Sequence, residues 1–364
     1  MTISEITNYL ESLAPLSLQE NYDNAGLIVG NKEDTVSGIL VCLDSLETVI
    51  DEAVQLNCNL IIAHHPIIFS GLKKLNGNNY IERTIIKAIK NNIAIYAIHT
   101  NLDNIRDGVN SMIAQKLGLE KCRVLSPKKG FLKKLVTFAP HETAGDIRTA
   151  IFNAGAGGIG NYDNCSFNLE GTGTFRGNEL SEPYVGIKGE LHLEPETRIE
   201  VIFPSFLEKK VLSALLKSHP YEEVAYDIYS LDNFHQNIGA GLIGRLAQPV
   251  EEGEFLQFVK DTMRCGALRH TALLKKRITK VAVCGGSGSF LLGDAIAAGA
   301  DIFISADFKY HQFFDADGRI LVADIGHYES EQYTIDMLGA LLMKKFPTFA
   351  VHFSKINTNP VNYL

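Results

Sequence analysis

The chain has 364 residues, of which 46% are hydrophobic and 21% charged, a composition typical of a soluble globular protein with room for two domains. The formal net charge of −8 argues against nucleic-acid binding through a broad basic surface, although it does not exclude a basic pocket for a phosphate. No stretch approaches the roughly 20 continuous apolar residues that a membrane span needs, so we expect no membrane partner.

The six cysteines are scattered and form no Cys-x-x-Cys pair, and Cys42 and Cys284 fall inside predicted strands. This pattern favours buried free thiols in a reducing compartment over a disulfide framework or a zinc knuckle. Residues 1–6 lack the basic and apolar regions of a signal peptide and look like a capped amphipathic helix. We therefore expect a cytoplasmic protein.

The first 120 residues alternate between strand and helix patterns. The predicted strands are 37–44, 59–63 and 93–98, and the predicted helices are 46–56, 80–91 and 108–117. Apolar strands that alternate with helices indicate a mainly parallel sheet covered on both faces. This part of the chain is therefore predicted to be α/β.

A segment of different character begins near residue 127. It contains a predicted strand at 132–138, a helix at 144–153, shorter strands up to 203, a helix at 206–217 and a strand at 222–229. That order is typical of an α+β sandwich of the ferredoxin-like type. We place an inserted domain at residues 127–235, which leaves 1–126 and 236–364 as one discontinuous core.

The α/β pattern resumes late in the chain. Strands are predicted at 279–284, 301–305, 320–325 and 349–353, a helix at 289–298, and a long helix from 327 to about 346. The sequence alone does not order these strands. We expect them to complete the core that the first 126 residues begin.

Side chains of the types that bind metals follow three predicted strands. His64 and His65 close the strand at 59–63, just before Pro66 ends it, and Asp103 follows the strand at 93–98. His327 and Glu331 lie one turn apart at the start of the last long helix. Each residue alone is compatible with a surface or packing role, but ligand types at the carboxyl edge of an α/β sheet predict a shared metal site.

Three histidines and two carboxylates suit Zn²⁺, Mn²⁺, Fe²⁺ or Co²⁺, and the set does not choose among them. Five side chains are too many for one tetrahedral ion, so we expect two divalent ions roughly 3.5–4 Å apart, bridged by Asp103 or Glu331 and by a water. Metal-bound water of this kind is a nucleophile for hydrolysis.

Other residues carry weaker signals. Gly286 and Gly288 lie between a predicted strand and a predicted helix, where backbone amides could form an anion subsite; a tight turn is the alternative. His99 could support the metal ligands or transfer a proton, and packing explains it equally well. Lys309 and His311 could orient a phosphate or transfer a proton, or belong to a surface loop.

Five segments resemble the Nif-three-like family, whose members carry the name GTP cyclohydrolase I type 2 homologues. They are residues 22–30 (YDNAGLIVG), 63–66 (AHHP), 99–103 (HTNLD), 307–311 (DFKYH) and 326–331 (GHYESE). The resemblance implies an α/β core of mainly parallel sheets flanked by helices, with two metals bound by His64, His65, Asp103, His327 and Glu331, commonly in a toroidal homohexamer. Residues 219–227 (HPYEEVAYD) resemble the inserted domain of longer members, which is similar to CutA-like and nitrogen-regulatory trimers.

Two classes of function remain open. The first is a metal-dependent hydrolase of a small nucleotide-like or heterocyclic substrate; if the family name holds, water would attack C8 of the GTP purine. The second is a metal-binding protein without turnover, which stores or delivers metal or regulates a partner. A pocket with open coordination positions and phosphate-binding groups beside the metals would favour the enzyme.

Overall fold

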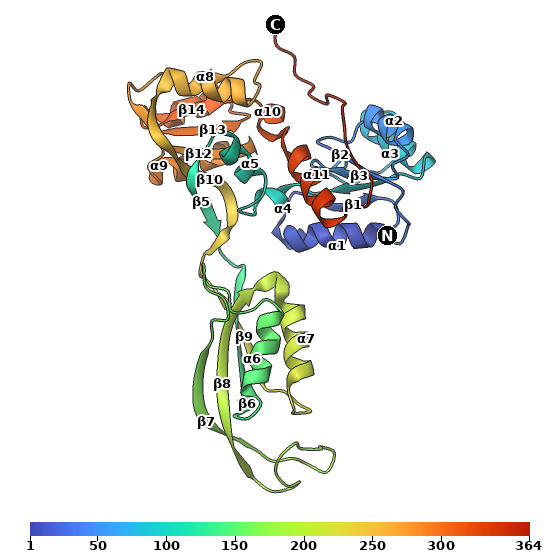
Figure 1. Ribbon diagram of the computed structural model, residues 1–364, viewed down its shortest axis with the longest axis vertical. Helices are drawn as coiled ribbons and strands as arrows, with labels where there is room; N and C mark the ends of the chain where they lie inside the picture. The colour runs from blue at the N-terminus through green and yellow to red at the C-terminus, as the bar shows by residue number, and fades with distance from the viewer. The chain divides into compact units, whose positions relative to one another are not determined.

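The structure, a computed structural model, describes residues 1–364 and divides them into two compact units. The first unit comprises residues 1–127 and 237–364, and the second comprises residues 128–236. Figure 1 shows the elements of each unit. None of the helices combines the length and the apolar character that crossing a membrane requires.

The first unit contains a five-stranded sheet in the order β1-β4-β3-β2-β15. Its strands are β1 (Gly26–Val29), β2 (Ile39–Cys42), β3 (Leu60–Ala63), β4 (Ala94–Ala97) and β15 (Val351–Phe353). The neighbours β15, β2, β3 and β4 are parallel, and β1 is antiparallel to β4. All four residues of β2, β3 and β4 are buried, as continuous apolar strands in a covered parallel sheet should be.

Helices cover both faces of this sheet. On one face pack α1 (Ile3–Leu13) and α11 (Thr334–Lys345), and on the other pack α2 (Glu47–Gln55) and α3 (Tyr80–Lys90). The α1 helix begins at Ile3 and is capped by Thr2, which forms a capping box with Glu5 as the sequence of residues 1–6 predicts. The short helix α4 (Thr100–Asp103) and then α5 (Val109–Lys116) follow β4.

The first unit also contains a six-stranded sheet in the order β11-β14-β13-β12-β10-β5. Its strands are β5 (Glu120–Lys128), β10 (His235–Glu251), β11 (Arg269–His270), β12 (Arg277–Ser287), β13 (Ile302–Ala306) and β14 (Leu321–Asp324). Strands β12, β13 and β14 are parallel. The helices α5 and α8 (Glu252–Thr262) pack on one face, and α9 (Leu292–Ala297) packs on the other.

The predicted long helix from 327 to about 346 is two helices in the structure. α10 (His327–Glu331) ends before Gln332, and α11 begins at Thr334. At the interruption, the Gln332 amide donates to the carbonyl of Met263 and the Tyr333 hydroxyl donates to that of Thr262. Both hydrogen bonds connect the interruption between α10 and α11 to the C-terminal end of α8. Similarly, the predicted helix at 289–298 is a 3-10 turn, η3 (Ser289–Leu291), followed by α9.

The second unit is a four-stranded antiparallel sheet with two helices on one face (Figure 1). In chain order it consists of β6 (Leu132–Pro140), α6 (Ala144–Asn153), β7 (Phe167–Phe175), β8 (His192–Pro204), η2 (Ser205–Leu207), α7 (Glu208–Ser218) and β9 (Tyr226–Leu231). The strand order is β7-β8-β6-β9. The β-α-β-β-α-β succession with this order is the ferredoxin-like arrangement.

Candidate metal centre

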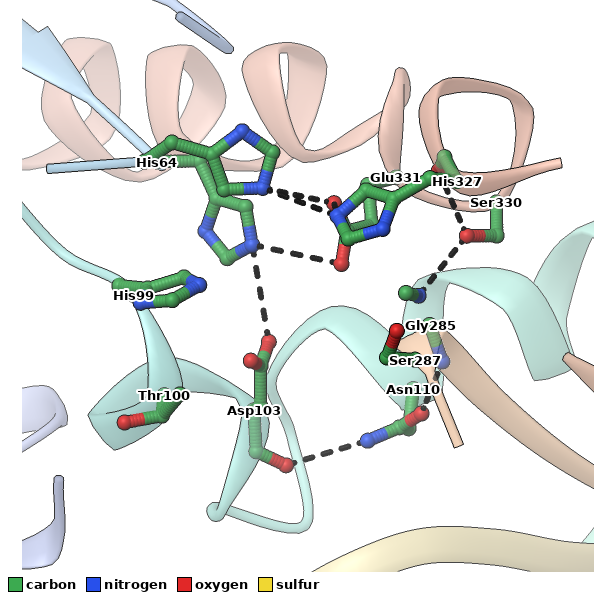
Figure 2. A network of polar contacts seen from close by, with 12 residues as sticks. His64, His99, Thr100, Asp103, Asn110, Gly285, Ser287, His327, Ser330 and Glu331 are labelled. Atoms are coloured by element: carbon green, nitrogen blue, oxygen red, sulfur yellow. Dashed lines mark hydrogen bonds and ion pairs between the residues drawn. The ribbon is translucent and has the colours of Figure 1, made fainter. Parts of the chain in front are cut away.

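The five predicted ligands come from three strand ends of the first unit. Figure 2 shows His64, Asp103, His327 and Glu331 pointing toward one another. His64 and His65 follow the last residue of β3, where their backbone N–H groups continue the pairing with Cys42 and Leu43. Asp103 is the last residue of α4, which begins three residues after β4. His327 and Glu331 are the first and last residues of α10, which follows β14 of the second sheet.

Glu331 lies at the middle of the group. Its Oε2 atom is 2.9 Å from His65 Nε2 and 3.1 Å from His327 Nε2, and its Oε1 atom is 3.8 Å from His64 Nε2. The two imidazole atoms His65 Nε2 and His327 Nε2 are 3.4 Å apart. Asp103 Oδ1 lies 3.7 Å from His64 Nε2. The nitrogen and oxygen atoms of the five side chains are thus gathered around Glu331.

Each of the three histidines is oriented through its other ring nitrogen. His64 Nδ1 lies 2.8 Å from the Ile98 carbonyl oxygen, which can only accept, so this nitrogen is the donor. His65 Nδ1 lies 2.7 Å from Asp44 Oδ1, and His327 Nδ1 lies 2.6 Å from Asp307 Oδ2. Such partners fix the ring orientation and turn the Nε2 lone pair toward the centre, as in metal sites.

Two atoms of the centre are buried without any hydrogen-bond partner, namely His64 Nε2 and Asp103 Oδ1. An unpaired buried polar atom costs roughly 1–3 kcal/mol, so two adjacent ones call for an explanation such as an ion that satisfies both. A divalent cation between them would accept both lone pairs. The residues present therefore fit a metal.

The electrostatics point the same way. Burial together with the charge of Glu331 raises the pKa of Asp103 well above its usual value. Burial alone would lower the pKa of His65, but Glu331 and Asp44 outweigh it and raise that pKa to about 10. The burial of Asp103 close to the charge of Glu331 thus disfavours the ionised form of Asp103, and a nearby cation would favour it.

His99, a weaker prediction, stands beside the same group. Its ring centre is 5.3 Å from those of His64 and His65, and the ligand atoms of these three histidines lie within 4.8 Å of one another. Its Nδ1 atom lies 2.7 Å from Asp23 Oδ1. Burial would raise the pKa of Asp23, but hydrogen bonds from His99 and Thr100 lower it to about 2, so Asp23 is a fixed anion behind His99.

A cavity of about 1280 Å³ opens beside the group and is lined by His65, His99, Asp103, His327 and Glu331. The chain after β15 forms part of its wall, because Thr358, Asn359 and Tyr363 line it too. Thr358 Oγ1 donates to Asp44 Oδ2 at 2.5 Å, and Asn359 donates to Glu329. The centre is thus accessible to a small molecule.

The predicted anion subsite at Gly286 and Gly288 is not open. The N–H of Gly286 donates to Ser330 Oγ, and that of Gly288 donates to Ser305 Oγ. Gly286 has another role, since its φ is +60° and a Cβ there would lie 2.5 Å from Glu331 Oε1. The glycine lets the backbone pass close to Glu331.

Lys309 and His311 do not line the cavity. Lys309 precedes the 3-10 helix η4 (Tyr310–Ala316), and its backbone N–H donates to Gln312 Oε1. The His311 ring packs beside Tyr310 and Phe314. These two residues belong to a surface segment rather than to the centre.

Sequence reasoning missed the residues that orient the histidines, Asp44 and Asp307, and the partner of Asp44, Thr358. Asp44 and Asp307 each follow a parallel strand, β2 and β13, at the same sheet edges as the ligands. The rule that led to His64 and Asp103 would have included both. Thr358 gives no comparable signal, because it lies in a segment without regular structure.

Comparison with known families matches residues 1–360 to Duf34/NIF3 (NGG1p interacting factor 3). The chain belongs to the Duf34/NIF3 family. The resemblance noted from the five sequence segments is therefore confirmed.

Relatives named "GTP cyclohydrolase 1 type 2 homolog" from Bacillus subtilis (strain 168) and Halalkalibacterium halodurans are 39% and 40% identical, each across 99% of this chain and 98% of the relative. A solved Bacillus cereus structure, described as a protein related to NIF3, covers 100% of this chain and 99% of its own, with a TM-score of 0.88 and 39% identity. A Staphylococcus aureus structure has a TM-score of 0.79 and 29% identity, with coverage of 100% and 99%. The Duf34/NIF3 fold thus spans both units.

Proposed function

We propose that this Duf34/NIF3 protein is a metal-dependent hydrolase of a small heterocyclic substrate. Two divalent ions would be held by the five residues His64, His65, Asp103, His327 and Glu331. The observation that carries the proposal is the pair of buried, unpartnered atoms His64 Nε2 and Asp103 Oδ1 beside an open cavity. The name that its relatives share suggests a purine nucleotide as one candidate substrate.

Divalent ions, when bound, supply Lewis acidity and lower the pKa of water that they coordinate. The chain's own residues orient the side chains that would bind these ions. Asp44, Asp307 and the Ile98 carbonyl hold three imidazoles in one tautomer and one orientation. This preorganisation means that little rearrangement is needed when ligands and substrate arrive.

His99 is suited to carry the proton of the reaction. Asp23 accepts from Nδ1, which leaves Nε2 directed at the centre, and Asp23 also accepts from the Thr100 N–H at 3.0 Å. A histidine that is oriented by a buried carboxylate is the arrangement of a general base. We propose this role for His99, with Asp23 as its positioning residue.

The alternative function, metal storage, delivery or regulation without turnover, would be favoured by ligands that close around the ions. Five side chains leave coordination positions free on two ions, and the cavity beside them has room for a substrate. These two features favour turnover.

The proposed function includes assembly into a cytoplasmic homohexamer, as the family resemblance implies. Large apolar side chains that one chain leaves exposed support an interface between copies; Leu180 is 94% and Phe314 64% exposed. Solution scattering at micromolar concentration should give the mass of six chains, and a monomer would contradict this part of the proposal.

The test begins with metal analysis of the purified protein and continues with a hydrolase screen that includes GTP, nucleosides and cyclic amides. His65→Ala and Glu331→Ala should each lose metal without unfolding. His270→Ala is the matched control, because His270 is exposed on β11 and does not line the cavity. Full metal content in either site variant would exclude that residue as a ligand.

His99→Gln and Asp23→Asn separate chemistry from metal binding. Both should keep the metal content and reduce turnover by about 10²–10⁴-fold, which is the usual contribution of a general base. A loss of metal in His99→Gln would instead make His99 a ligand. Metal-loaded protein that hydrolyses nothing in the screen would favour the storage function.

A further inference from the structure

The lining of the cavity is strongly acidic. It contains seven carboxylates and one guanidinium group, that of Arg269. The imidazoles of His65 and His327 also line it, and imidazoles that bind a metal are neutral. The carboxylates are those of Glu20, Asp44, Asp103, Asp307, Asp324, Glu329 and Glu331. Because two divalent ions carry fewer positive charges than the excess of carboxylates, the lining stays negative even with both ions bound.

Arg269 is already engaged by other groups of the protein. Its guanidinium pairs with Asp324 and donates to the Phe308 carbonyl at 3.1 Å. The same group lies over the Phe313 ring, 5.3 Å from the ring centre. These contacts already use the planar face and part of the donor fork that would bind a phosphate.

The backbone amides that would cradle an anion are also occupied. Beside the N–H groups of Gly286 and Gly288, described above, that of Gly285 donates to Asn110 Oδ1 at 3.0 Å. Polyphosphates are bound in proteins by exposed loop amides together with Lys or Arg. Apart from Arg269, which is paired with Asp324, the cavity lining has no Lys or Arg, and the N–H groups of Gly285, Gly286 and Gly288 are occupied.

The rim of the cavity offers aromatic rings instead. Tyr22, Phe69, Tyr80 and Phe290 line it, and each is more than half exposed. The Phe69 ring stands edge-on to His99, with ring centres 5.7 Å apart, so it is next to the centre. Exposed rings stack on planar molecules and attract cations.

We propose that the substrate is a planar nitrogen heterocycle that enters uncharged or cationic, without a polyphosphate chain. This inference rests on the proposed function and narrows its substrate class. The acidic lining repels a nucleoside triphosphate, and the aromatic rim favours a heterocycle that carries no phosphates. A hydrolysable bond within the ring would then lie at the metal centre.

The test measures equilibrium binding to metal-loaded, full-length protein by calorimetry, with guanosine, GMP and GTP as a series that differs only in phosphate. A second set contains the neutral rings adenine, cytosine and hydantoin and the cationic ring 1-methylnicotinamide, with inorganic triphosphate as the polyanion. Affinity should fall or stay level as phosphates are added, and at least one neutral or cationic ring should bind. GTP binding at least 10-fold tighter than guanosine, or no binder among the neutral and cationic rings, would overturn the proposal.

Two matched variants test the charge argument directly. Phe290→Lys adds a cation to the rim and should raise the affinity for inorganic triphosphate at least 5-fold. Phe258→Lys is the control, because Phe258 is 44% exposed on α8 and does not line the cavity. An unchanged affinity in Phe290→Lys would show that the charge of the cavity does not select the ligand.

The outcomes separate this inference from the proposed function. A protein that takes up no metal contradicts the proposed function before any ligand is added. A metal-loaded protein that binds neutral rings and hydrolyses none of them contradicts turnover but supports the substrate class. Metal content measured after each titration shows whether GTP or triphosphate has only removed the ions.

Discussion

Asp44 connects the metal centre to the segment that follows β15. Its Oδ1 atom accepts from His65 Nδ1 at 2.7 Å and its Oδ2 atom accepts from Thr358 at 2.5 Å. Burial would raise the pKa of Asp44, but the hydrogen bond and charge of His65 outweigh burial and lower it, so Asp44 is an anion. An anion behind the imidazole makes its Nε2 atom a stronger ligand.

Asp44→Asn should therefore weaken metal binding by about 10–100-fold, as losses of such partners typically do. Thr358→Val should have a smaller effect in the same direction, and Thr358→Ser should restore the affinity. A competition assay with a metal-binding dye measures both. Asp317→Asn, at an exposed turn, is the control. Wild-type affinity in Asp44→Asn would contradict the positioning role.

Gly286 allows a second test at the level of a single residue. Gly286→Ala combines a positive φ with a Cβ 2.5 Å from Glu331 Oε1, so either the loop or Glu331 must move. We expect a loss of stability of about 1–3 kcal/mol and a lower metal content. Gly293→Ala, in α9 with no atom within 4 Å of its Cβ, should be neutral or stabilising. Thermal unfolding measures the stability of both variants, and metal analysis measures their metal content.

At the level of elements, prediction succeeded where apolar runs end abruptly. The predicted strands at 59–63 and 93–98 are β3 and β4, and the ends of these strands place His64, His65 and Asp103 as expected. Their role as ligands stays a prediction. The site was predictable because parallel strands bring their carboxyl ends to one edge.

The elements that prediction missed have weak patterns for physical reasons. β10 contains Gly239, where a Cβ would lie 2.1 Å from the Ser126 carbonyl oxygen, and Gly241, so it does not look like a strand. β5 is largely polar at its start. The break after Gln332 depends on bonds to α8, more than sixty residues away in the chain, which no local pattern contains.

The start of α3 allows a test of pH dependence. The Glu82 carboxylate accepts from the N–H groups of Asn76 and Asn78 at 3.1 Å each, and these bonds lower its pKa. A carboxyl group whose pKa is lower in the folded state than in the unfolded state stabilises the fold at pH values above its unfolded-state pKa. This stabilisation is lost as the pH falls through the folded-state pKa. Glu82→Gln should thus have a lower Tm than the wild type at pH 7, and the difference should shrink as the pH falls through the folded-state pKa of Glu82. Glu33→Gln, at an exposed position, should show no such difference at any of these pH values.

At the level of the whole molecule, the second unit leaves and rejoins the first at neighbouring strands. The chain departs at the end of β5 and returns at the start of β10, and β5 and β10 are adjacent in the six-stranded sheet. Replacing residues 128–236 with a short linker should therefore leave a folded core that binds metal, because inserted domains usually have close ends. Circular dichroism and metal analysis test the shortened protein. Recovery of only insoluble core, where the full chain is soluble, would contradict these boundaries.

The five predicted ligands lie in two distant parts of the chain, so they are synthesised at different times. Asp103 and His327 are separated by roughly 220 residues. At ~5–20 residues per second, His327 and Glu331 are made on the order of ten to forty seconds after Asp103. During that interval the nascent chain presents His64, His65 and Asp103 without the carboxylate that lies between the histidines. The complete set of predicted ligands therefore forms only after translation has passed residue 331, and we expect all five side chains to bind ions together only after that point.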